Sequence, residues 1–384
     1  MKIAHICLTG PYSDGWNYQE NLLSKYHHKN GHDVCVVASR YTWNLKGTIE
    51  ECDRDFYTDE NGVEIYRLRI EHNRNLLSKL KKYVGLYELL ENLSPDTLFI
   101  HGCQFCDIDT IVRYLKKNPN VATYVDNHAD FSNSATSWLS KNVLHKIIWR
   151  HYAKKIDPFV KKWYGVLPAR VDFLKRIYGL PADKIEYLPM GADDELVDKY
   201  SSPEIRSEYR KKYGISDDDI LLVTGGKIDL AKKQTLLLMD AVNQIYNPKL
   251  KLIVFGSVVP ELKSDVEMRC SAKVKYIGWL SSEESYPHFA MADLVVFPGR
   301  HSVFWEQVAG QGIPMIVKYW PGTTHVVTGG NVEFLCNDTV DEIVKKICEI
   351  SLKENLLNMK EKALKKQNFF SYGNIAKNSI KKEI

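Results

Sequence analysis

Short runs of apolar residues recur along the whole chain of 384 residues, and most of them are continuously apolar rather than alternating with polar residues. Such runs are typical of strands that are buried on both faces of a parallel sheet. Segments of helical length lie between the runs; in one, Tyr18, Leu22 and Tyr26 recur at every fourth position and Gly31 marks the end. The repeated strand–helix order predicts an α/β protein with two doubly wound domains. The predicted strands span residues 2–8, 33–39, 64–70, 97–101, 122–128, 163–169, 185–189, 220–226, 251–256, 274–279, 293–299, 315–320 and 332–336.

A polar interruption divides this pattern in two. Residues 190–215 are polar and charged and contain no strand-like run, and a new strand–helix series begins after them. We therefore predict Rossmann-like domains at residues 1–195 and 196–365, followed by a last segment at 366–384. In such domains ligands bind beyond the carboxyl ends of the strands, and the deepest cleft is expected between the two domains.

Composition narrows the class of protein. Hydrophobic residues make up 44% and charged residues 26%, which excludes a disordered chain. The net charge of +4 is too small to indicate nucleic-acid binding by itself. No apolar run reaches the roughly 18–20 residues that span a bilayer, and the N-terminus is typical of a first strand rather than of a signal peptide, so we expect a cytoplasmic protein.

The eight cysteines give no sign of a metal site. In a reducing compartment they are expected to be free thiols. Cys103 and Cys106 form the one suggestive pair, but a structural zinc site usually needs a second pair, and the sequence has none. We expect no metal and no bound cofactor.

A glycine-containing loop follows the first predicted strand. Gly10 and Gly15 flank a turn that leads into a helix, and a helix N-terminus with permissive glycines can approach a phosphate or a sugar ring. The spacing is not that of a dinucleotide fingerprint. A plain connecting loop remains the alternative.

A second loop joins glycines to lysines at residues 223–234. A buried strand ends at Gly225 and Gly226, and Lys227, Lys232 and Lys233 precede the next helix. Two cations at this spacing can close on one diphosphate, while the glycines let the backbone approach it. Exposed lysines without a ligand are the alternative interpretation.

A third loop, within residues 292–314, carries polar side chains between a buried strand and a helix. His301 and Ser302 lie in the loop, and Glu306 and Gln307 lie on the helix. A carboxylate here can accept hydrogen bonds from ribose hydroxyls. An ordinary capped surface helix would look the same in the sequence.

Two histidines end predicted strands of the first domain. His101 closes the strand at 97–101 and His128 closes that at 122–128, between Asp126 and Asp130. Either imidazole is in a position to face the cleft. A packed or capping histidine is the competing interpretation for each.

Basic side chains gather in the first domain. Between residues 141 and 170 cations are interleaved with Trp and Tyr, with Asp157 as the one acid, and residues 75–90 add lysines beside an apolar stripe. Such faces can dock on anionic lipid. An amphipathic helix packed on its own sheet is the alternative. The cations are Lys141, Lys146, Arg150, Lys154, Lys155, Lys161, Lys162 and Arg170.

Taken together, these segments resemble the retaining glycosyltransferases of family 4, which have the GT-B fold. The resemblance covers nearly the whole chain and rests on the order and spacing of motifs that are each weak alone. It implies an acceptor-binding first domain, a nucleotide-sugar-binding second domain and a last helix, within 366–384, that crosses back to the first domain. The matching positions are Gly15, 31–34, 95–101, His128, 190–193, 226–232, Gly256, Gly278, Asp293, Pro298 and 370–380.

The resemblance also implies roles for individual residues. Lys227 and Lys232 would hold the diphosphate, with Lys227 in place of the family's usual Arg, so that the charge is kept but bidentate contact is lost. His128 would hydrogen-bond to the reacting sugar. His325 stands where a later loop of the family usually carries Glu.

The family's E-x7-E motif is broken in this chain. Counting back from 312–314 places Gln307 at the second Glu position and Gly299 at the first, with Glu306 one residue before Gln307. His301, Ser302 or backbone amides would then meet the donor sugar, and Glu306, assisted by Gln307, would bind ribose.

The sequence thus predicts a metal-independent GT-B glycosyltransferase. It would move a sugar from a nucleotide-sugar, expected to be a UDP-sugar, to a glycan or lipid-linked acceptor, with retention of configuration. Family habit suggests capsule, O-antigen or exopolysaccharide synthesis, with peripheral contact at the inner face of the cell membrane. The alternatives are a non-catalytic nucleotide-sugar-binding protein, supported by the broken motif, and a sugar-nucleotide epimerase of the same fold.

Overall fold

A computed structural model describes residues 1–44, 48–71 and 81–381. The chain divides into two compact units, one made of residues 1–189 and 375–384 and the other of residues 190–374. The division lies at 189/190, before the position 195 expected from the polar stretch. The reason is local, since the Ala192 N–H donates to the carbonyl of Phe370 and a side chain on Gly310 would collide with Ala192, so this turn packs with the second unit.

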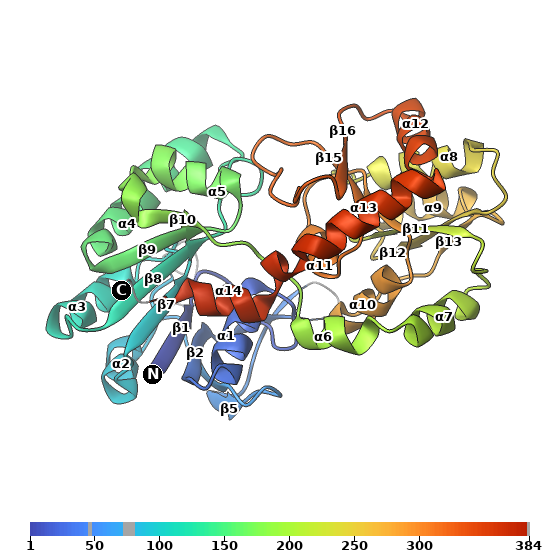
Figure 1. Cartoon of the computed structure of the whole chain (residues 1–384). Helices are drawn as coiled ribbons and strands as arrows, with labels where there is room; N and C mark the ends of the chain where they lie inside the picture. The colour runs from blue at the N-terminus through green and yellow to red at the C-terminus, as the bar shows by residue number, and fades with distance from the viewer. Residues whose placement is uncertain (45–47, 72–80, 382–384) are drawn as a thin grey trace. The chain divides into compact units, whose positions relative to one another are not determined.

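The first unit is built on an eight-stranded sheet in the order β10-β9-β8-β7-β1-β2-β6-β5 (Figure 1). Every pairing is parallel except that of β5 with β6. The strands are β1 (Lys2–Cys7), β2 (Asp33–Ser39), β5 (Phe56–Thr58), β6 (Glu64–Leu68), β7 (Thr97–His101), β8 (Ala122–Asn127), β9 (Val160–Gly165) and β10 (Ile185–Tyr187), with a separate hairpin of β3 (Tyr41–Trp43) and β4 (Ile49–Glu51). The hairpin and β5 were not expected from the sequence, because their residues are exposed or half-buried and form no apolar run.

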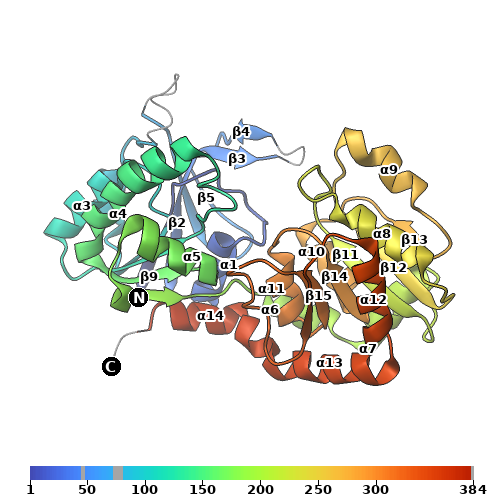
Figure 2. The ribbon, with the colours of Figure 1, turned by 90° about the horizontal axis from the view of Figure 1, so that it is seen from above.

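Both faces of this sheet are buried, which explains its continuous apolar runs. One face carries Ile6, Ile100 and Trp163 and packs with residues of α2 (Leu86–Leu93), α3 (Ile108–Lys117) and α4 (Arg150–Ile156). The alternate positions point to the other face, where α1 (Gln19–Lys29) and α14 (Tyr372–Ser379) lie side by side (Figures 1 and 2). The unit also contains the π-helical segment η2 (Ser140–Trp149) and the six-residue helix α5 (Pro168–Phe173).

The second unit has a six-stranded, all-parallel sheet in the order β13-β12-β11-β14-β15-β16. This is the strand order of a Rossmann domain, in which the direction of winding reverses between the first and fourth strands. The strands are β11 (Ile220–Gly225), β12 (Leu250–Phe255), β13 (Val274–Tyr276), β14 (Leu294–Phe297), β15 (Met315–Lys318) and β16 (Val332–Leu335). The helices are α6 (Asp194–Tyr200), α7 (Pro203–Lys212), α8 (Gln234–Gln244), α9 (Lys263–Met268), α10 (Ser282–Ala290), α11 (Phe304–Gly310), α12 (Val340–Ile350) and α13 (Lys353–Lys366).

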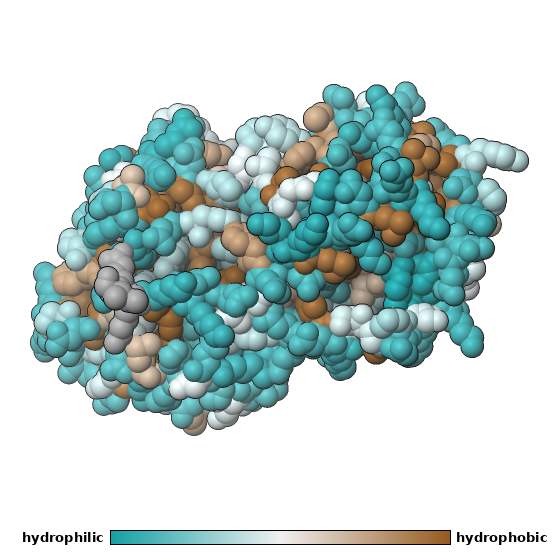
Figure 3. Space-filling view, in the orientation of Figure 1, coloured by the Kyte–Doolittle hydropathy of each residue, from teal (hydrophilic) through white to brown (hydrophobic). Residues whose placement is uncertain are grey.

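The topology fixes where a ligand is expected in each unit. The winding reverses between β1 and β7 in the first sheet and between β11 and β14 in the second. The carboxyl ends of these strand pairs are the switch points at which open α/β sheets bind ligands. On the side shown in Figure 3 the surface of each unit is mostly hydrophilic, with apolar side chains scattered or in small groups.

Candidate functional site

At the switch point of the second sheet, glycines bring two loops close together. Gly226 follows β11 with a φ of +125°, in the left-handed range that favours glycine. A side chain on Gly256, after β12, would place its Cβ 1.9 Å from the carbonyl oxygen of Gly226. The space next to Gly226 itself is open, since a Cβ there would meet nothing within 4 Å. The backbone at the end of β11 is therefore accessible to a ligand.

Cations crowd around this backbone. The side chain of Lys227 is 61% exposed, and its Nζ lies 3.8 Å from Asp229. Burial lowers the pKa of Lys232, and repulsion from Arg300 and Lys227 lowers it further, although Asp229 opposes the effect. The loop therefore holds cations whose charges repel each other, which is the electrostatic setting of an anion site.

Arg300 belongs to this cluster, and the sequence interpretation had given it no role. It follows Gly299, where a Cβ would lie 3.9 Å from the Cα of Lys232, so the loop after β14 runs directly beside the loop after β11. The signal that could have found it is the adjacency of β11 and β14 in a Rossmann order, because neighbouring parallel strands place their following loops together.

Glu306, at the start of α11, has a different setting from the ribose-facing position expected for it. Its side chain is fully buried, and its Oε1 accepts hydrogen bonds from Nε2 of His301 at 2.8 Å and Nε2 of His325 at 2.7 Å. Burial alone would raise the pKa of this carboxyl, but the two imidazoles outweigh burial and lower it. His325, from the loop after β15, thus pairs with a carboxylate from α11.

The neighbouring candidate residues also form hydrogen bonds within the second unit. Gln307 is buried, and its Nε2 donates to Ser285 Oγ at 2.9 Å. Ser302 Oγ accepts from the N–H of Phe304 at 3.4 Å, at the entrance to α11. His301 and Ser302 remain partly exposed, with 13% of the His301 side chain accessible.

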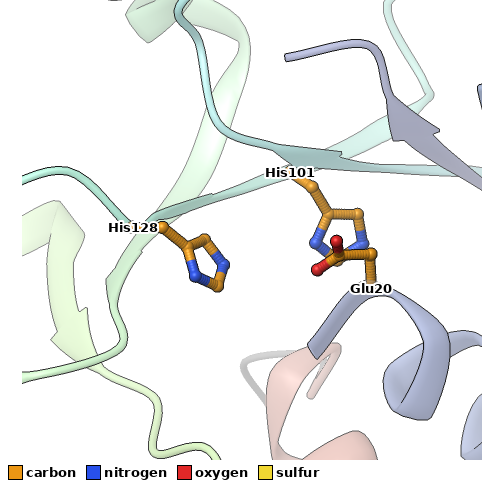
Figure 4. A group of neighbouring side chains, drawn as sticks. All are labelled: Glu20, His101 and His128. Atoms are coloured by element: carbon orange, nitrogen blue, oxygen red, sulfur yellow. The ribbon is translucent and has the colours of Figure 1, made fainter. Parts of the chain in front are cut away.

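In the first unit, side chains from three elements turn toward one space at the switch point (Figure 4). Glu20 comes from the first turn of α1, His101 ends β7 and His128 follows β8. One polar atom from each lies within 4.8 Å of the others. The side chain of His128 is 36% exposed, and its Nε2 lies 3.4 Å from Oδ1 of the fully buried Asp126. Gly15 has a φ of +69° and lies in the loop that leads into α1, the helix carrying Glu20.

The His101 side chain is engaged on both sides. Its Nδ1 lies 2.7 Å from Oδ2 of Asp126 and its Nε2 lies 2.9 Å from Nδ1 of His5. In the other histidine pair, His301 and His325 already direct Nε2 at Glu306. Within the described ranges, these two groups are the ones that bring three metal-ligating atoms together. Hydrogen bonds to Glu306 hold the second group together, and in the first group both ring nitrogens of His101 are engaged by Asp126 and His5.

Comparison with known proteins shows similarity to glycosyltransferases in the sequence of the second unit and in the fold of the chain. Residues 219–352 match the family described as "Glycosyl transferases group 1". A curated relative, an uncharacterized glycosyltransferase of Methanocaldococcus jannaschii, is 20% identical over 78% of this chain and 75% of its own. Among solved structures, the fold resembles HepE of Anabaena in complex with UDP and glucose, with a TM-score of 0.68 and 14% identity over 98% of both chains. It also resembles the UDP-GlcNAc 2-epimerase of Neisseria meningitidis, with a TM-score of 0.62 and 13% identity over 98% of both chains. The chain therefore has the α/β fold of the GT-B glycosyltransferases, with two Rossmann-like units, and its second unit carries the group 1 match.

Proposed function

We propose that this protein is a glycosyltransferase that uses a nucleotide-sugar donor, with a UDP-sugar as the first candidate. The observation that carries the proposal is the cation cluster of Lys227, Lys232 and Arg300 beside the open backbone of Gly226. A diphosphate would relieve the repulsion among these cations. It would also accept hydrogen bonds from their donors, which strengthens binding through charge.

In this proposal the cations also assist the chemical step. The bond between the sugar and the diphosphate breaks, and negative charge develops on the leaving phosphate. Fixed positive charges placed at that position stabilise the transition state more than the ground state, and they do so without a metal. Lys232 is better suited to this role than Lys227, because its half-buried ammonium acts in a less polar medium than an exposed one.

His128 is proposed to contact the reacting sugar. With Nε2 directed at Asp126, the ring presents its other nitrogen, Nδ1, for a hydrogen bond with a sugar hydroxyl. His301 is proposed to do the same from the second unit, with Glu306 fixing its Nε2–H. We assign no protein nucleophile, and retention of configuration remains part of the proposal through the resemblance to family 4.

The acceptor is proposed to be a glycan or a lipid-linked sugar in the synthesis of a surface polysaccharide, reached at the membrane face. No helix among the described residues is both long and apolar enough to cross a membrane. Support for surface contact comes from the segment around η2, where Trp138 is 74%, Leu139 60% and Ile147 63% exposed, next to the exposed Lys146. Insertion of such side chains into a bilayer interface gains about 1.5–3 kcal/mol each, and each cation near anionic lipid adds about 1 kcal/mol.

The structure changes which side chains of the basic stretch support this docking. Lys155 lies 2.6 Å from Asp109, and Lys162 lies 2.6 Å from Glu186. Their charges are partly balanced by these acids. The proposed docking surface is therefore the segment from Trp138 to Ile147 rather than Lys155 and Lys162.

A donor panel tests the proposed function. The protein is incubated with UDP-, GDP- and ADP-sugars, with and without glycan and lipid-linked acceptors, and free nucleotide and new sugar nucleotides are quantified. Transfer predicts nucleotide release that depends on acceptor. The epimerase, which shares the fold, predicts donor interconversion without acceptor, and a binding protein predicts a thermal shift with donor but no turnover.

A further inference from the structure

Three histidines form a continuous line of hydrogen bonds across the buried face of the first sheet. His27 on α1 meets His5 on β1, with 3.0 Å between Nδ1 and Nε2, and His5 meets His101, with 2.9 Å between Nδ1 and Nε2. At one end, Nε2 of His27 lies 3.1 Å from the carbonyl oxygen of Ala376 in α14. At the other end, Nδ1 of His101 lies 2.7 Å from Oδ2 of Asp126. We call His27, His5 and His101 the histidine chain.

The positions of the protons can be derived by starting from the hydrogen bond between His27 and α14. A carbonyl oxygen only accepts, so the Nε2 of His27 donates to Ala376. A neutral His27 then accepts at Nδ1, which makes Nε2 of His5 the donor. A neutral His5 in turn accepts at Nδ1, which makes Nε2 of His101 the donor.

The same reasoning, started from Asp126, shows that three neutral rings carry one proton too few for these hydrogen bonds. The imidazoles of His101 and His128 lower the pKa of Asp126, and an ionised carboxylate only accepts, so Nδ1 of His101 donates to it. Four hydrogen bonds therefore need four protons, whereas three neutral imidazoles carry three. We propose that the histidine chain holds one proton more than three neutral rings, that this proton makes His101 an imidazolium paired with Asp126, and that this buried ion pair positions His128. The last part rests on the proposed function; the protonation state does not.

The electrostatic environment supports this distribution of charge. Burial lowers the pKa of His5 far below its usual value, with further lowering by His27 and His101, and burial lowers the pKa of His27 to about 3 despite its bond to Ala376. Burial by itself would also lower the pKa of His101, but Asp126 outweighs it and the pKa is raised. Burial would raise the pKa of Asp126, and the imidazoles of His101 and His128 instead lower it.

Groups from each neighbouring element face the histidine chain. α1 contributes the carboxylate of Glu20 and is followed by His32, whose ring lies 6.2 Å from that of His27. The sheet contributes Phe99, stacked 5.5 Å from His5, and Asp126. α14 contributes the carbonyl of Ala376 and the hydroxyl of Ser379. The two carboxylates lie near the His101 end, which favours the positive charge there.

The link to the proposed reaction is Asp126. One of its oxygens holds His101, and the other lies 3.4 Å from Nε2 of His128. An unbalanced buried carboxylate is unstable, and the imidazolium of His101 balances it. The histidine chain therefore keeps Asp126 ionised and fixed in place behind His128. His5, His27 and His101 are positioning residues in this account.

Two other proton arrangements leave all three rings neutral and fit the distances. In one, Asp126 is protonated and donates to Nδ1 of His101, which the lowered pKa of Asp126 opposes. The other uses Ser379. Ser379 Oγ lies 3.0 Å from Nε2 of His27, and its proton, which now bonds the carbonyl of Ala376 at 2.9 Å, would instead point at His27. All three rings would then be neutral and protonated at Nδ1. This arrangement directs the lone pair of His27 Nε2 at the carbonyl of Ala376, 3.1 Å away, which is repulsive.

NMR of protein labelled with ¹⁵N in the imidazole rings, at neutral pH, distinguishes the proposed proton arrangement from those with three neutral rings. We expect both nitrogens of His101 to be protonated, and His5 and His27 to be neutral with the proton on Nε2. Three neutral rings, protonated at either nitrogen, would overturn the proposal. A Ser379→Ala variant is the matched control. Under the proposal the ring signals should be unchanged, whereas the arrangement in which Ser379 donates to His27 needs that hydroxyl, so the signals should change.

Kinetics test the positioning part. His27→Gln keeps a donor for Ala376 and an acceptor for His5, whereas His27→Leu keeps neither. We expect His27→Leu to lower kcat about tenfold or more with an unchanged KM for the donor, and His27→Gln to restore kcat to within about threefold, because general acid–base and hydrogen-bonding groups depend on orientation. Equal kcat values for folded Leu and Gln variants would refute the positioning of His128. A protein without transferase activity would refute the proposed function and leave the NMR result standing.

Discussion

Replacement of Lys232 by Met separates the ligand-binding role of this residue from its effect on the fold. Lys232 is half-buried, and burial together with Arg300 and Lys227 lowers its pKa, so its positive charge is less favourable in the free folded protein than in water. Methionine keeps most of the apolar stem and removes the charge. We therefore expect Lys232→Met to leave the thermal stability of the free protein unchanged or to raise it.

Binding should change in the opposite direction. A hydrogen bond to a charged group contributes about 1.5–3 kcal/mol, and every 1.4 kcal/mol is tenfold in affinity, so the Kd for UDP should rise roughly tenfold to a hundredfold. If the lysine also stabilises the leaving phosphate, kcat/KM should fall by about 10²–10³. Lys233→Met is the control, since Lys233 is exposed at the neighbouring position and has no assigned role.

Thermal unfolding with and without UDP measures both effects in one experiment. Bound UDP should raise the Tm of the wild-type protein and of Lys233→Met by mass action, and raise that of Lys232→Met much less. The reasoning fails if Lys232→Met binds UDP as tightly as the wild type. It also fails if the free variant is strongly destabilised, because Lys232 would then be a structural residue.

Three further outcomes are expected. The lowered pKa of Glu306 means that its ionised form stabilises the fold at pH values above the pKa of an unfolded Glu, about 4.3, and that this stability is lost as pH falls below that value. Glu306→Gln should therefore flatten the acid side of a plot of Tm against pH, and an unchanged plot would contradict this. Changing Trp138, Leu139 and Ile147 together to Gln should abolish sedimentation of the protein with anionic vesicles but leave activity on a soluble acceptor unchanged. The control is Leu352→Gln, at an equally exposed apolar position in the second unit, which should not change sedimentation. Activity should withstand excess EDTA, since lysines supply the positive charge; loss that Mg²⁺ restores would exclude the proposed mechanism.

Much of the fold follows from the sequence because its main signals are local. The continuous apolar runs correspond to the central strands of both sheets, and the glycines after β11 and β12 lie where two loops approach each other. The positions of Lys227, Lys232 and His128 at strand ends follow from the alternation of strands and helices. Short strands with exposed residues, such as β5, have no such signal.

The partners of the site residues could not be predicted in this way, because they come from distant parts of the chain. His5 and His101 are 96 residues apart, and Glu306 and His325 are 19 apart. A histidine in an apolar run looks the same whether it is isolated or bonded to another histidine. Only the strand order, which places β1 beside β7, brings His5 to His101. Likewise, the burial of Glu306 depends on a loop after β15 that returns His325 to α11.

The central claim is that the second unit holds the diphosphate of a sugar donor for transfer to an acceptor. The most direct test is to incubate the purified protein with a UDP-sugar labelled in the sugar, with and without a lipid-linked acceptor, and to follow UDP and the label together. The account predicts that UDP is released and the label moves to the acceptor in equal amounts, and that Lys232→Met slows both by about 10²–10³. Conversion of the donor to an epimer without acceptor, or tight binding of the donor with neither release nor transfer, would contradict it.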